Sequence, residues 1–493
     1  TMKPLQVTMP SLYGHCASVW TSAHTILVLW VLFSLLAFAI ASSTLSHEDG
    51  RGIAILVFVI FGWGVRPGGT SMEYTSIAFL TLLTTSGAVT WHEAWGGMAS
   101  ESVWLVFCGM AMSTALMEKN ICERGAALLC RGDPSWPSLV VRLHLVSALL
   151  ALTVPSQVVR CQLVLPIARG IVSRRGIKAC SRTAAAVMVS LVVCTNHCGE
   201  AVLTGSVPNI LAVGLLERCN VAVPWGTWFL RMAPTFGAVN LAGNIAIVLL
   251  LVRAEERAAP KDGPQALPVP ELGTPAPPAM APLAVGELAV LGVFALSLVL
   301  WATDLLHGIR PVVIGLLAVL LLFGPKFGPV PFDAVRRLNF PILILVTAFM
   351  ALVPLLSSTP SAGRTVREAA RAMVLLVQGS APRHAAVFVA AIPLMLLTNS
   401  SLPAGILVPE LCAGGGLAAS GVDARLGAML VASMSNCALL PFQNAPFLIA
   451  MSLSRDVVCE KHFIAAMVVN SAFTVLVVMP LTLAWWGVLG WST

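Results

Sequence analysis

The chain has 493 residues, of which 57% are hydrophobic and only 10% are charged, and its mean hydropathy is +0.88. Soluble globular domains carry about 25% charged residues, so this composition excludes a soluble protein and predicts an all-α, polytopic membrane protein. The formal net charge of +7 is small for this length and is typical of basic cytoplasmic loops, not of a nucleic-acid partner.

At about 20 residues per span, the apolar segments predict about eleven transmembrane helices. The first spans are His24–Ile40, Ile53–Val65 and Tyr74–Val89. We assign residues 1–102 to a set of N-terminal scaffold helices.

The 12 cysteines are scattered along the chain, and no two are spaced as C-x-x-C. Most lie within apolar runs, where cysteine behaves as a small hydrophobic side chain. We therefore expect reduced cysteines and neither a disulfide framework nor a metal site. Typical examples are Cys108, Cys161, Cys194 and Cys437.

A first repeat is predicted over residues 103–252. It begins with the helix Val103–Leu116 and continues with the apolar stretch 139–171, which the polar sequence TVPSQVVR interrupts near its middle. Each apolar arm has about 14 residues and reaches about 21 Å at 1.5 Å per residue, less than the roughly 30 Å of a bilayer core. We therefore predict a re-entrant hairpin. Five basic residues follow without an acidic one and indicate the cytoplasmic side: Arg169, Arg174, Arg175, Lys178 and Arg182.

The stretch Thr195–Asn209, TNHCGEAVLTGSVPN, is a polar interruption of the apolar run 184–216. Hydrocarbon does not tolerate such residues unless the backbone is broken and lines a cavity. Secondary transporters hold substrate and ions at broken helices, because the half-helix ends present unpaired N–H and C=O groups. The stretch predicts a broken helix at a transport site. The alternative is a long buried loop between two short spans.

The second half repeats this order after a linker. Residues 253–286 are rich in Pro, Ala and charge and predict a disordered linker. Within residues 287–493, a hairpin at 385–412 has a polar tip, and a broken helix at 425–454 is interrupted by SMSNCALLPFQNAP. One Asp and one Arg follow this hairpin instead of five basic residues, which predicts inverted repeats. The alternative is a chance similarity between two apolar halves.

Several motifs resemble those of one family. The sequence LTGSVPN at Leu203–Asn209 looks like L-T-G-T-G-P-N, and Asn196 stands where an N-I-G-G run begins. MEKNICERGAAL at Met117–Leu128 is similar to E-K-x-N-L-x-x-R-I-A-L. From about Val103 to about Ser454, the linker excepted, the chain resembles the divalent anion:sodium symporter family of sodium-coupled carboxylate and sulfate cotransporters, and its animal branch in particular.

This resemblance implies a set of binding residues. In the family, a Ser-Asn-Thr triplet at each hairpin tip binds sodium and a substrate carboxylate. Here Ser156-Gln157-Val158 stands at the first tip, with Gln for Asn and Val for Thr. The implied substrate-binding residues are Ser156, Gln157, Thr398, Asn399, Ser400 and Pro208. The implied sodium ligands are Ser156, Gly199, Thr204, Gly205, Ser206, Asn209, Asn399 and Asn444.

Three ionisable residues have no counterpart in the family pattern. Arg160 lies one turn beyond the first tip, and His197 and Glu200 lie at the opening of the interruption. One interpretation is that Arg160 and Glu200 pair with each other at the rim of the site. The other adds Arg160 to the substrate-binding residues: its guanidinium points at a substrate carboxylate and supplies part of the positive charge of a sodium ion. His197 and Glu200 would then add proton coupling.

Together these features predict a secondary active transporter and not an enzyme, because no HExxH, GxSxG or paired-Asp motif is present. We expect it to carry small divalent anions, either di- or tricarboxylates such as succinate or citrate, or sulfate, coupled to sodium. The resemblance implies a homodimer in the lipid of the plasma membrane, with a hairpin domain that moves as an elevator. Two alternatives stay open: a diverged member that acts as a proton-coupled carrier or anion exchanger, and a transport-dead regulatory paralogue.

Overall fold

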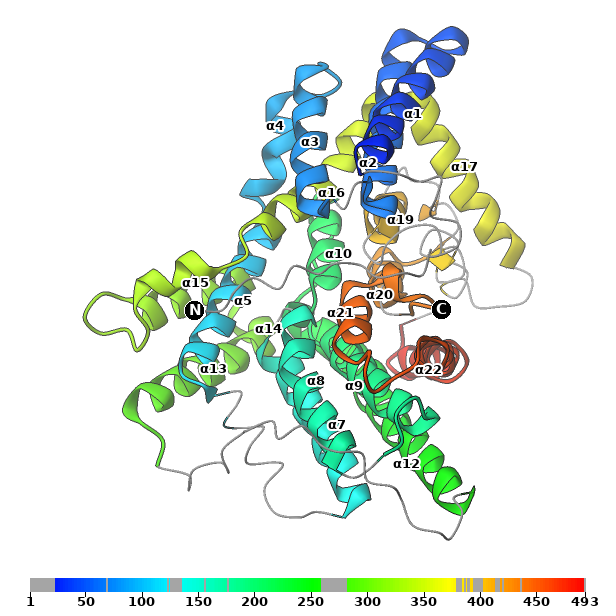
Figure 1. The fold of residues 1–493 in the computed structure, drawn as a ribbon. Helices are drawn as coiled ribbons and strands as arrows, with labels where there is room; N and C mark the ends of the chain where they lie inside the picture. Colours follow the sequence, from blue (N-terminus) through cyan, green and yellow to red (C-terminus); the bar gives the residue numbers. More distant parts are fainter. Residues whose placement is uncertain are drawn as a thin grey trace.

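The computed structural model describes residues 23–67, 70–121, 124, 135–154, 157–174, 177–258, 282–377, 384, 387, 391–392, 402–412, 417–418, 421–434 and 437–491. Every regular element among these residues is a helix (Figure 1), which confirms the all-α fold class. Most of the predicted linker, at 259–281, lies outside the described residues, as does the tip of the predicted second hairpin, at 393–401.

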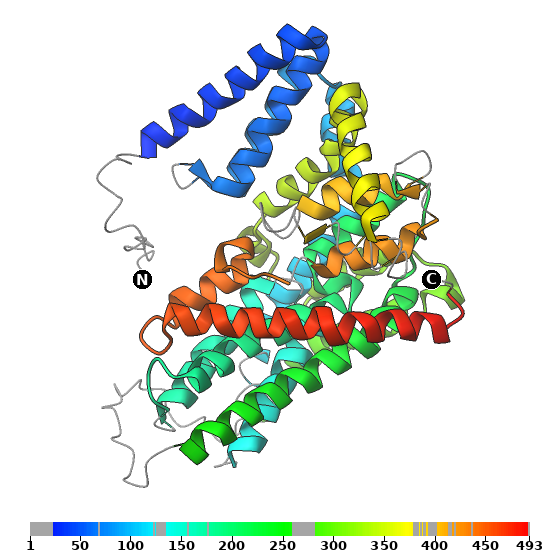
Figure 2. The ribbon, with the colours of Figure 1, turned by 90° about the vertical axis from the view of Figure 1, so that its right-hand side faces the viewer.

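Helices α1 (Ala23–Thr44) and α2 (His47–Val65) form a hairpin at one end of the molecule (Figure 2). The Ser46 hydroxyl accepts a hydrogen bond from the Asp49 backbone N–H and so caps the start of α2. Helix α1 packs mainly against α2 and exposes more than half of Leu32, Phe33 and Leu36. Lipid tails are as apolar as these side chains, so this face suits contact with lipid. Next follow α3 (Met72–Thr85), α4 (Trp91–Trp95) and η2 (Gly96–Ala99).

Two largely buried helices join this end to the rest of the fold. Helix α5 (Glu101–Glu118) packs against α10, α13 and α15, and α16 (Pro341–Ser358) packs against α2, α3 and α19. The remaining helices of this part are α13 (Val285–Ala302), α14 (Asp304–His307), α15 (Pro311–Phe323), η5 (Phe332–Arg337) and α17 (Pro360–Val377).

Helix α9 (Arg182–Glu200) is the centre of the fold. Every residue from Thr183 to Glu200 is buried, because α7 (Trp136–Thr153), α8 (Gln157–Arg174), α12 and α22 all pack against it. A helix that is apolar on all sides has to be buried on all sides, and the small and branched residues of AAAVMVSLVV meet this condition. The polar residues at its C-terminal end are thereby carried into the interior.

The two halves share one order of elements. In the first, α9 is followed by the short 3-10 turn η3 (Leu203–Gly205), by α10 (Val207–Glu217) and by a long helix with a π-helical middle. In the second, α20 (Ala424–Met434), η7 (Pro441–Gln443) and α21 (Ala445–Leu453) precede another long helix with a π-helical middle. The inverted orientation of the two halves stays a prediction. The first long helix consists of α11 (Trp225–Met232), η4 (Ala233–Val239) and α12 (Asn240–Ala258). The second consists of α22 (Glu460–Phe473), η8 (Thr474–Val478) and α23 (Met479–Val488). The remaining described helix is α19 (Leu402–Glu410).

The two long helices meet at their π-helical middles (Figure 2). The Thr482 hydroxyl donates to the Thr235 hydroxyl (2.8 Å), and Asn240 Nδ2 donates to the Thr474 hydroxyl (3.3 Å). Such interhelical hydrogen bonds hold membrane helices together, because polar side chains find few other partners in hydrocarbon. These contacts join the first half of the chain to its C-terminal end.

Four helices of the described part are long and apolar enough to cross a membrane: Trp225–Ala254, Val285–Ala302, Pro341–Ser358 and Glu460–Val488. The bent pair Trp91–Ala99 and Glu101–Glu118 would make a fifth span. Several other apolar helices have only 10–17 residues. The total of about eleven spans stays a prediction.

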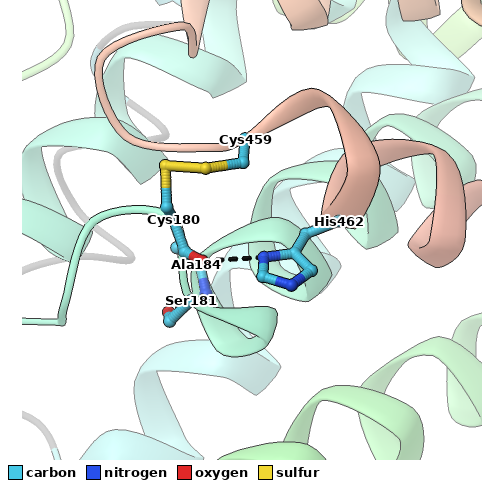
Figure 3. The surroundings of a disulfide bond; sticks show 5 residues. All are labelled: Cys180, Ser181, Ala184, Cys459 and His462. Atoms are coloured by element: carbon cyan, nitrogen blue, oxygen red, sulfur yellow. Dashed lines mark hydrogen bonds between the residues drawn. A yellow bond between two sulfur atoms is a disulfide. The ribbon is translucent and has the colours of Figure 1, made fainter.

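Two disulfides correct the expectation that the cysteines are reduced. Cys180 is bonded to Cys459 (Figure 3), and Cys219 is bonded to Cys412. The partners are 279 and 193 residues apart, so no local spacing of cysteines in the sequence predicts these bonds. The expectation is confirmed for the four buried free cysteines that were named as examples, Cys108, Cys161, Cys194 and Cys437.

A buried aspartate fixes the start of the first long helix. Asp304 is 7% exposed, and its carboxylate accepts hydrogen bonds from the backbone N–H groups of Trp225 (2.6 Å) and Gly226 (3.4 Å). The first N–H groups of a helix have no partner within it, and a negative charge is favourable there. The side chain of α14 thus caps α11 from a distance of 79 residues.

We predict that Asp304→Ala lowers the free energy of unfolding by about 1–3 kcal/mol, because two buried N–H groups lose their acceptor. The measurement is the thermal unfolding midpoint in detergent, followed by tryptophan fluorescence. Asp333→Ala is the matched control, since Asp333 is 73% exposed and forms a surface ion pair with Arg336. Equal midpoints for the two variants would contradict the capping role.

Candidate functional site

The first hairpin brings its tip against the break between α9 and α10. Helix α7 ends at Thr153 and α8 begins at Gln157, so the chain turns back within a few residues. Gln157 Nε2 donates to the Ser206 hydroxyl (3.2 Å). Ser156, which the sequence also predicts at this tip, lies outside the described residues.

Arg160 is the most deeply buried cation of the site. It is 0% exposed, and its Nη1 donates to the carbonyl oxygens of Val154 (2.6 Å) and Gly205 (2.7 Å). These carbonyls belong to the hairpin tip and to the helix break, so the guanidinium ties the two together. Within the described part of the chain, Arg160 forms no ion pair, and its Nε and Nη2 have no hydrogen-bond partner.

Two glycines make room for this arrangement. A Cβ atom on Gly199 would lie 2.4 Å from Arg160 Nη2, and a Cβ atom on Gly205 would lie 2.6 Å from the Gly199 carbonyl oxygen. Contacts under 3.0 Å essentially never occur around real Cβ atoms. The close approach of the guanidinium to the break therefore requires glycine at both positions.

The carbonyl groups at the end of α9 are capped by one asparagine. Asn209 Nδ2 donates to the carbonyl oxygens of Gly199 (3.1 Å), Glu200 (3.3 Å) and Val202 (2.9 Å). The last carbonyl groups of a helix have no partner within it, and in an apolar interior they need one. Asn209 thus holds the break from the α10 side, while its own Oδ1 has no partner among the described residues.

The helix continues further into the predicted interruption than the polar sequence indicates. Asn196, His197 and Glu200 lie on the last turns of α9, and the break begins only at Ala201. Their side chains are polar, but the helical backbone satisfies its own hydrogen bonds, so it need not break at the first polar residue. The Asn196 side chain is 0% exposed and has no hydrogen-bond partner in the described part of the chain.

His197 and Glu200 pair with each other. Their side chains share a hydrogen bond of 2.5 Å between Nδ1 and Oε2, and both are buried. His197 Nε2 lies 3.4 Å from the Thr474 hydroxyl of the C-terminal long helix. The ion pair between Arg160 and Glu200, one of the two interpretations of the sequence, is not formed among the described residues.

The other predicted residues of the first site lie in the break itself. The Thr204 hydroxyl accepts a hydrogen bond from Trp225 Nε1 (3.3 Å), and Pro208 is buried in the first turn of α10, where a missing N–H leaves no intrahelical bond unmade. The structure brings together eight predicted residues, and their binding roles stay predictions: Gln157, Arg160, Gly199, Thr204, Gly205, Ser206, Pro208 and Asn209.

The second site is described only in part. Asn444 is 2% exposed and precedes α21, in the second break. Thr398, Asn399 and Ser400 lie outside the described residues. The two broken helices pack against each other, since α20 contacts α10 and α21 contacts both α8 and α9.

Sequence reasoning missed three residues that support the first site from other helices. Trp225 donates to Thr204, Trp228 Nε1 donates to the Glu200 carbonyl oxygen (2.8 Å), and Thr474 contacts His197. Polar atoms within apolar spans are a signal of functional positions, but the sequence does not say which broken helix they approach.

Electrostatically, the site favours an anion. Helices α8 and α10 both begin here, and the N-terminus of a helix carries a partial positive charge and free N–H groups. The Arg160 guanidinium lies between them and holds the carbonyl oxygen of Gly205. Unpartnered donors on Arg160 and Asn196 add hydrogen-bonding capacity. An arrangement of this kind offers positive charge and hydrogen-bond donors to an anion.

Comparison with known proteins agrees with this picture. The family described as the sodium:sulfate symporter transmembrane region matches residues 20–492. A membrane protein of Cupriavidus necator is 24% identical over 334 residues, which cover 62% of this chain and 63% of that protein. An L-tartrate/succinate antiporter of Shigella dysenteriae is 28% identical over 228 residues, 44% of each chain. The chain thus spans less than two thirds of the length of both relatives.

Among solved structures, the YdaH transporter of Alcanivorax borkumensis aligns with a TM-score of 0.46 and 15% identity, over 96% of this chain and 99% of that one. The closer likeness to the animal branch stays a prediction. The family match extends over almost the entire chain, including both predicted repeats. The chain therefore belongs to the sodium:sulfate symporter family and is a multi-pass membrane protein.

Proposed function

We propose that this transporter carries small divalent anions, either di- or tricarboxylates such as succinate or citrate, or sulfate, and that Arg160 binds the anion. The observation that carries the proposal is the buried guanidinium, which has no acidic partner among the described residues and which offers two unpartnered N–H positions.

A buried charge is strongly unfavourable unless it is paired. The Nη1 group of Arg160 is held by two carbonyl oxygens, which orient the guanidinium but do not neutralise it. Nε and Nη2 form the side of a guanidinium that donates two parallel hydrogen bonds to one carboxylate or sulfate. A bound dianion would satisfy this side and supply the missing negative charge.

The names of the relatives support the same class of substrate. One is a tartrate and succinate antiporter, and the family is named for sulfate. These ligands share two negative charges and oxygen atoms that accept hydrogen bonds. Asn196, whose amide is buried near the end of α9 and has no partner in the described residues, is the second side chain that we assign to the substrate.

We further propose that the first tip binds no sodium and that transport proceeds by anion exchange. The Gly205 carbonyl oxygen already accepts from Arg160, the Gly199 carbonyl oxygen from Asn209, and the Ser206 hydroxyl from Gln157. A sodium ion on the same carbonyl as the guanidinium would meet a like charge, which costs about 4 kcal/mol at 4 Å and an effective dielectric constant of about 20. A sodium site is then left only to the second tip and Asn444, and the proposed exchange does not depend on it. We also propose a homodimer, inverted repeats and an elevator motion, on the ground of the family resemblance.

The proposal predicts accelerated uptake when the liposome interior contains an exchangeable anion. Proteoliposomes are assayed for uptake of radiolabelled succinate, citrate and sulfate with internal anion, with an inward sodium gradient, with an inward proton gradient, or with none. Internal anion should raise the rate at least several-fold above the other conditions. Uptake that requires sodium would support symport instead, and uptake that requires protons would support a proton-coupled carrier. No uptake of any of the three anions would identify a transport-dead paralogue.

Replacing Arg160 with Gln should reduce uptake by about tenfold or more, because a hydrogen bond to a charged group contributes about 1.5–3 kcal/mol. Arg160→Lys keeps the charge but loses the two parallel donors, so it should retain an intermediate rate. Arg253→Gln, on an exposed position of α12, is the control. Size-exclusion profiles establish that all variants are folded. Unchanged uptake in a folded Arg160→Gln protein would overturn the assignment.

Replacing Gly205 with Ala should also abolish uptake, because the new methyl group would collide with the Gly199 carbonyl oxygen at 2.6 Å and with the Ala151 carbonyl oxygen at 3.1 Å. Both obstacles are backbone atoms, so the break has to open and Arg160 has to leave its position. The control is Gly292→Ala, where a Cβ atom meets nothing within 4 Å. Equal uptake in the two variants would contradict the tight geometry of the break.

A further inference from the structure

The two disulfides lie at opposite ends of the first broken helix. Cys180 precedes α9, which begins at Arg182, and Cys219 follows α10, which ends at Glu217. At 1.5 Å per residue, α9 and α10 are about 28 and 16 Å long. Together they exceed the roughly 30 Å core of a bilayer. The Cys180–Cys459 and Cys219–Cys412 bonds therefore belong to opposite faces of the membrane.

The charges assign a side to each bond. Arg169, Arg174, Arg175, Lys178 and Arg182 surround Cys180 in the sequence, without an acidic residue among them, and such segments stay in the cytoplasm. The cytoplasm keeps most protein thiols reduced, whereas the opposite compartment allows permanent disulfides. Cys180–Cys459 is thus the bond that meets reductants.

The Cys180–Cys459 bond is also accessible. Cys180 is exposed and Cys459 is partly exposed, whereas Cys412 of the other bond is 6% exposed. Exposed disulfides are the ones that exchange with thiols, and neighbouring basic residues stabilise the thiolate that exchange requires. The two bonds therefore differ in both compartment and access.

This bond clamps two connections from different halves of the chain. The Cys180 backbone N–H donates to the Val457 carbonyl oxygen (2.8 Å), and His462 Nδ1 donates to the Cys180 carbonyl oxygen (2.7 Å; Figure 3). An exposed ion pair joins Arg169 of α8 to Asp456 (2.5 Å). Apart from the disulfide, these are weak surface contacts. The disulfide adds a covalent bond between the α8–α9 and α21–α22 connections, next to the packing of α9 against α22 and of α8 against α21.

We propose that Cys180–Cys459 is a thiol-exchange site through which cytoplasmic reductants release this clamp and accelerate transport. A thiolate of a dithiol reductant attacks one sulfur, forms a mixed disulfide with that cysteine and releases the other cysteine. The second thiol of the reductant then attacks the mixed disulfide and releases the first cysteine. The reductant is oxidised to its own disulfide, and the two electrons and two protons that it gives up convert Cys180 and Cys459 into two free thiols. After release, the hairpin arm α8 and α21 are held together by non-covalent packing alone. The effect on transport rests on the proposed function, but the exchange and the release do not.

The first experiment determines which face reaches the bond. Inside-out and right-side-out membrane vesicles that contain the full chain are treated with a membrane-impermeant phosphine and then with an impermeant polymer-linked maleimide. Labelling that is lost in the Cys180→Ser, Cys459→Ser double variant should appear only in inside-out vesicles. Cys180-dependent labelling from the opposite face, or purified protein in which mild oxidation forms no Cys180–Cys459 bond, would overturn the proposal.

The second experiment determines whether reduction releases the clamp. Hydrogen exchange of residues 177–181 should become at least threefold faster after reduction, because the Cys180 amide loses its fixed acceptor. Anion exchange in proteoliposomes should rise several-fold on reduction, and Cys459→Ser should be fast in both conditions. Cys219→Ser, the matched control, should keep the response to reductant.

Equal hydrogen exchange in the oxidised and reduced proteins would refute the clamp, and equal transport rates would refute its control of transport. If neither form carries any anion, the proposed function fails. In that case the vesicle labelling and the hydrogen exchange still decide between a releasable and a fixed bond.

Discussion

The structure depends on a guanidinium placed where the chain is broken twice. Arg160 reaches from the start of α8 to carbonyl oxygens of the hairpin tip and of the α9–α10 break, and both breaks lie in the buried centre of the molecule. Broken backbone in a membrane interior persists only if its polar groups find partners. The cation provides such partners and leaves a charge that the described protein groups do not neutralise. The same residue thus stabilises the break and carries the buried positive charge that, in our proposal, a bound anion neutralises.

The remaining groups at the break are satisfied by residues from both sides of it. Asn209 binds three carbonyl oxygens at the end of α9, and Trp228 of the first long helix binds one of them as well. His197 and Glu200 share a hydrogen bond, and His197 also contacts Thr474. A change in the position of the C-terminal long helix therefore reaches the end of α9 through this contact. Such a path joins the site to an element of the other half.

The two halves are connected at three places, by hydrogen bonds at one and by disulfides at the other two. Threonine and asparagine side chains link the π-helical middles of the long helices inside the membrane. Cys219–Cys412 covalently links the residues that follow α10 and α19, and Cys180–Cys459 covalently links the α8–α9 and α21–α22 connections at the basic face. Only the last is exposed to thiols of the cytoplasm in our assignment. In the proposed function the two halves move relative to one another, and Cys180–Cys459 is the connection between them that can be released.

The sequence alone determined that the chain is an all-α membrane protein, that 139–171 and 184–216 are interrupted, and that it resembles anion transporters, because hydropathy, helix-breaking residues and short motifs are local properties. It did not determine where the α9 break begins, since Asn196, His197 and Glu200 are polar and yet helical. It left open whether Arg160 pairs with Glu200 or remains available, and it missed both disulfides. Gly205, which binds Arg160, and the partners of the disulfide cysteines are 45 to 279 residues away in the sequence. Only the tertiary structure decides such contacts, because it brings distant segments together around α9.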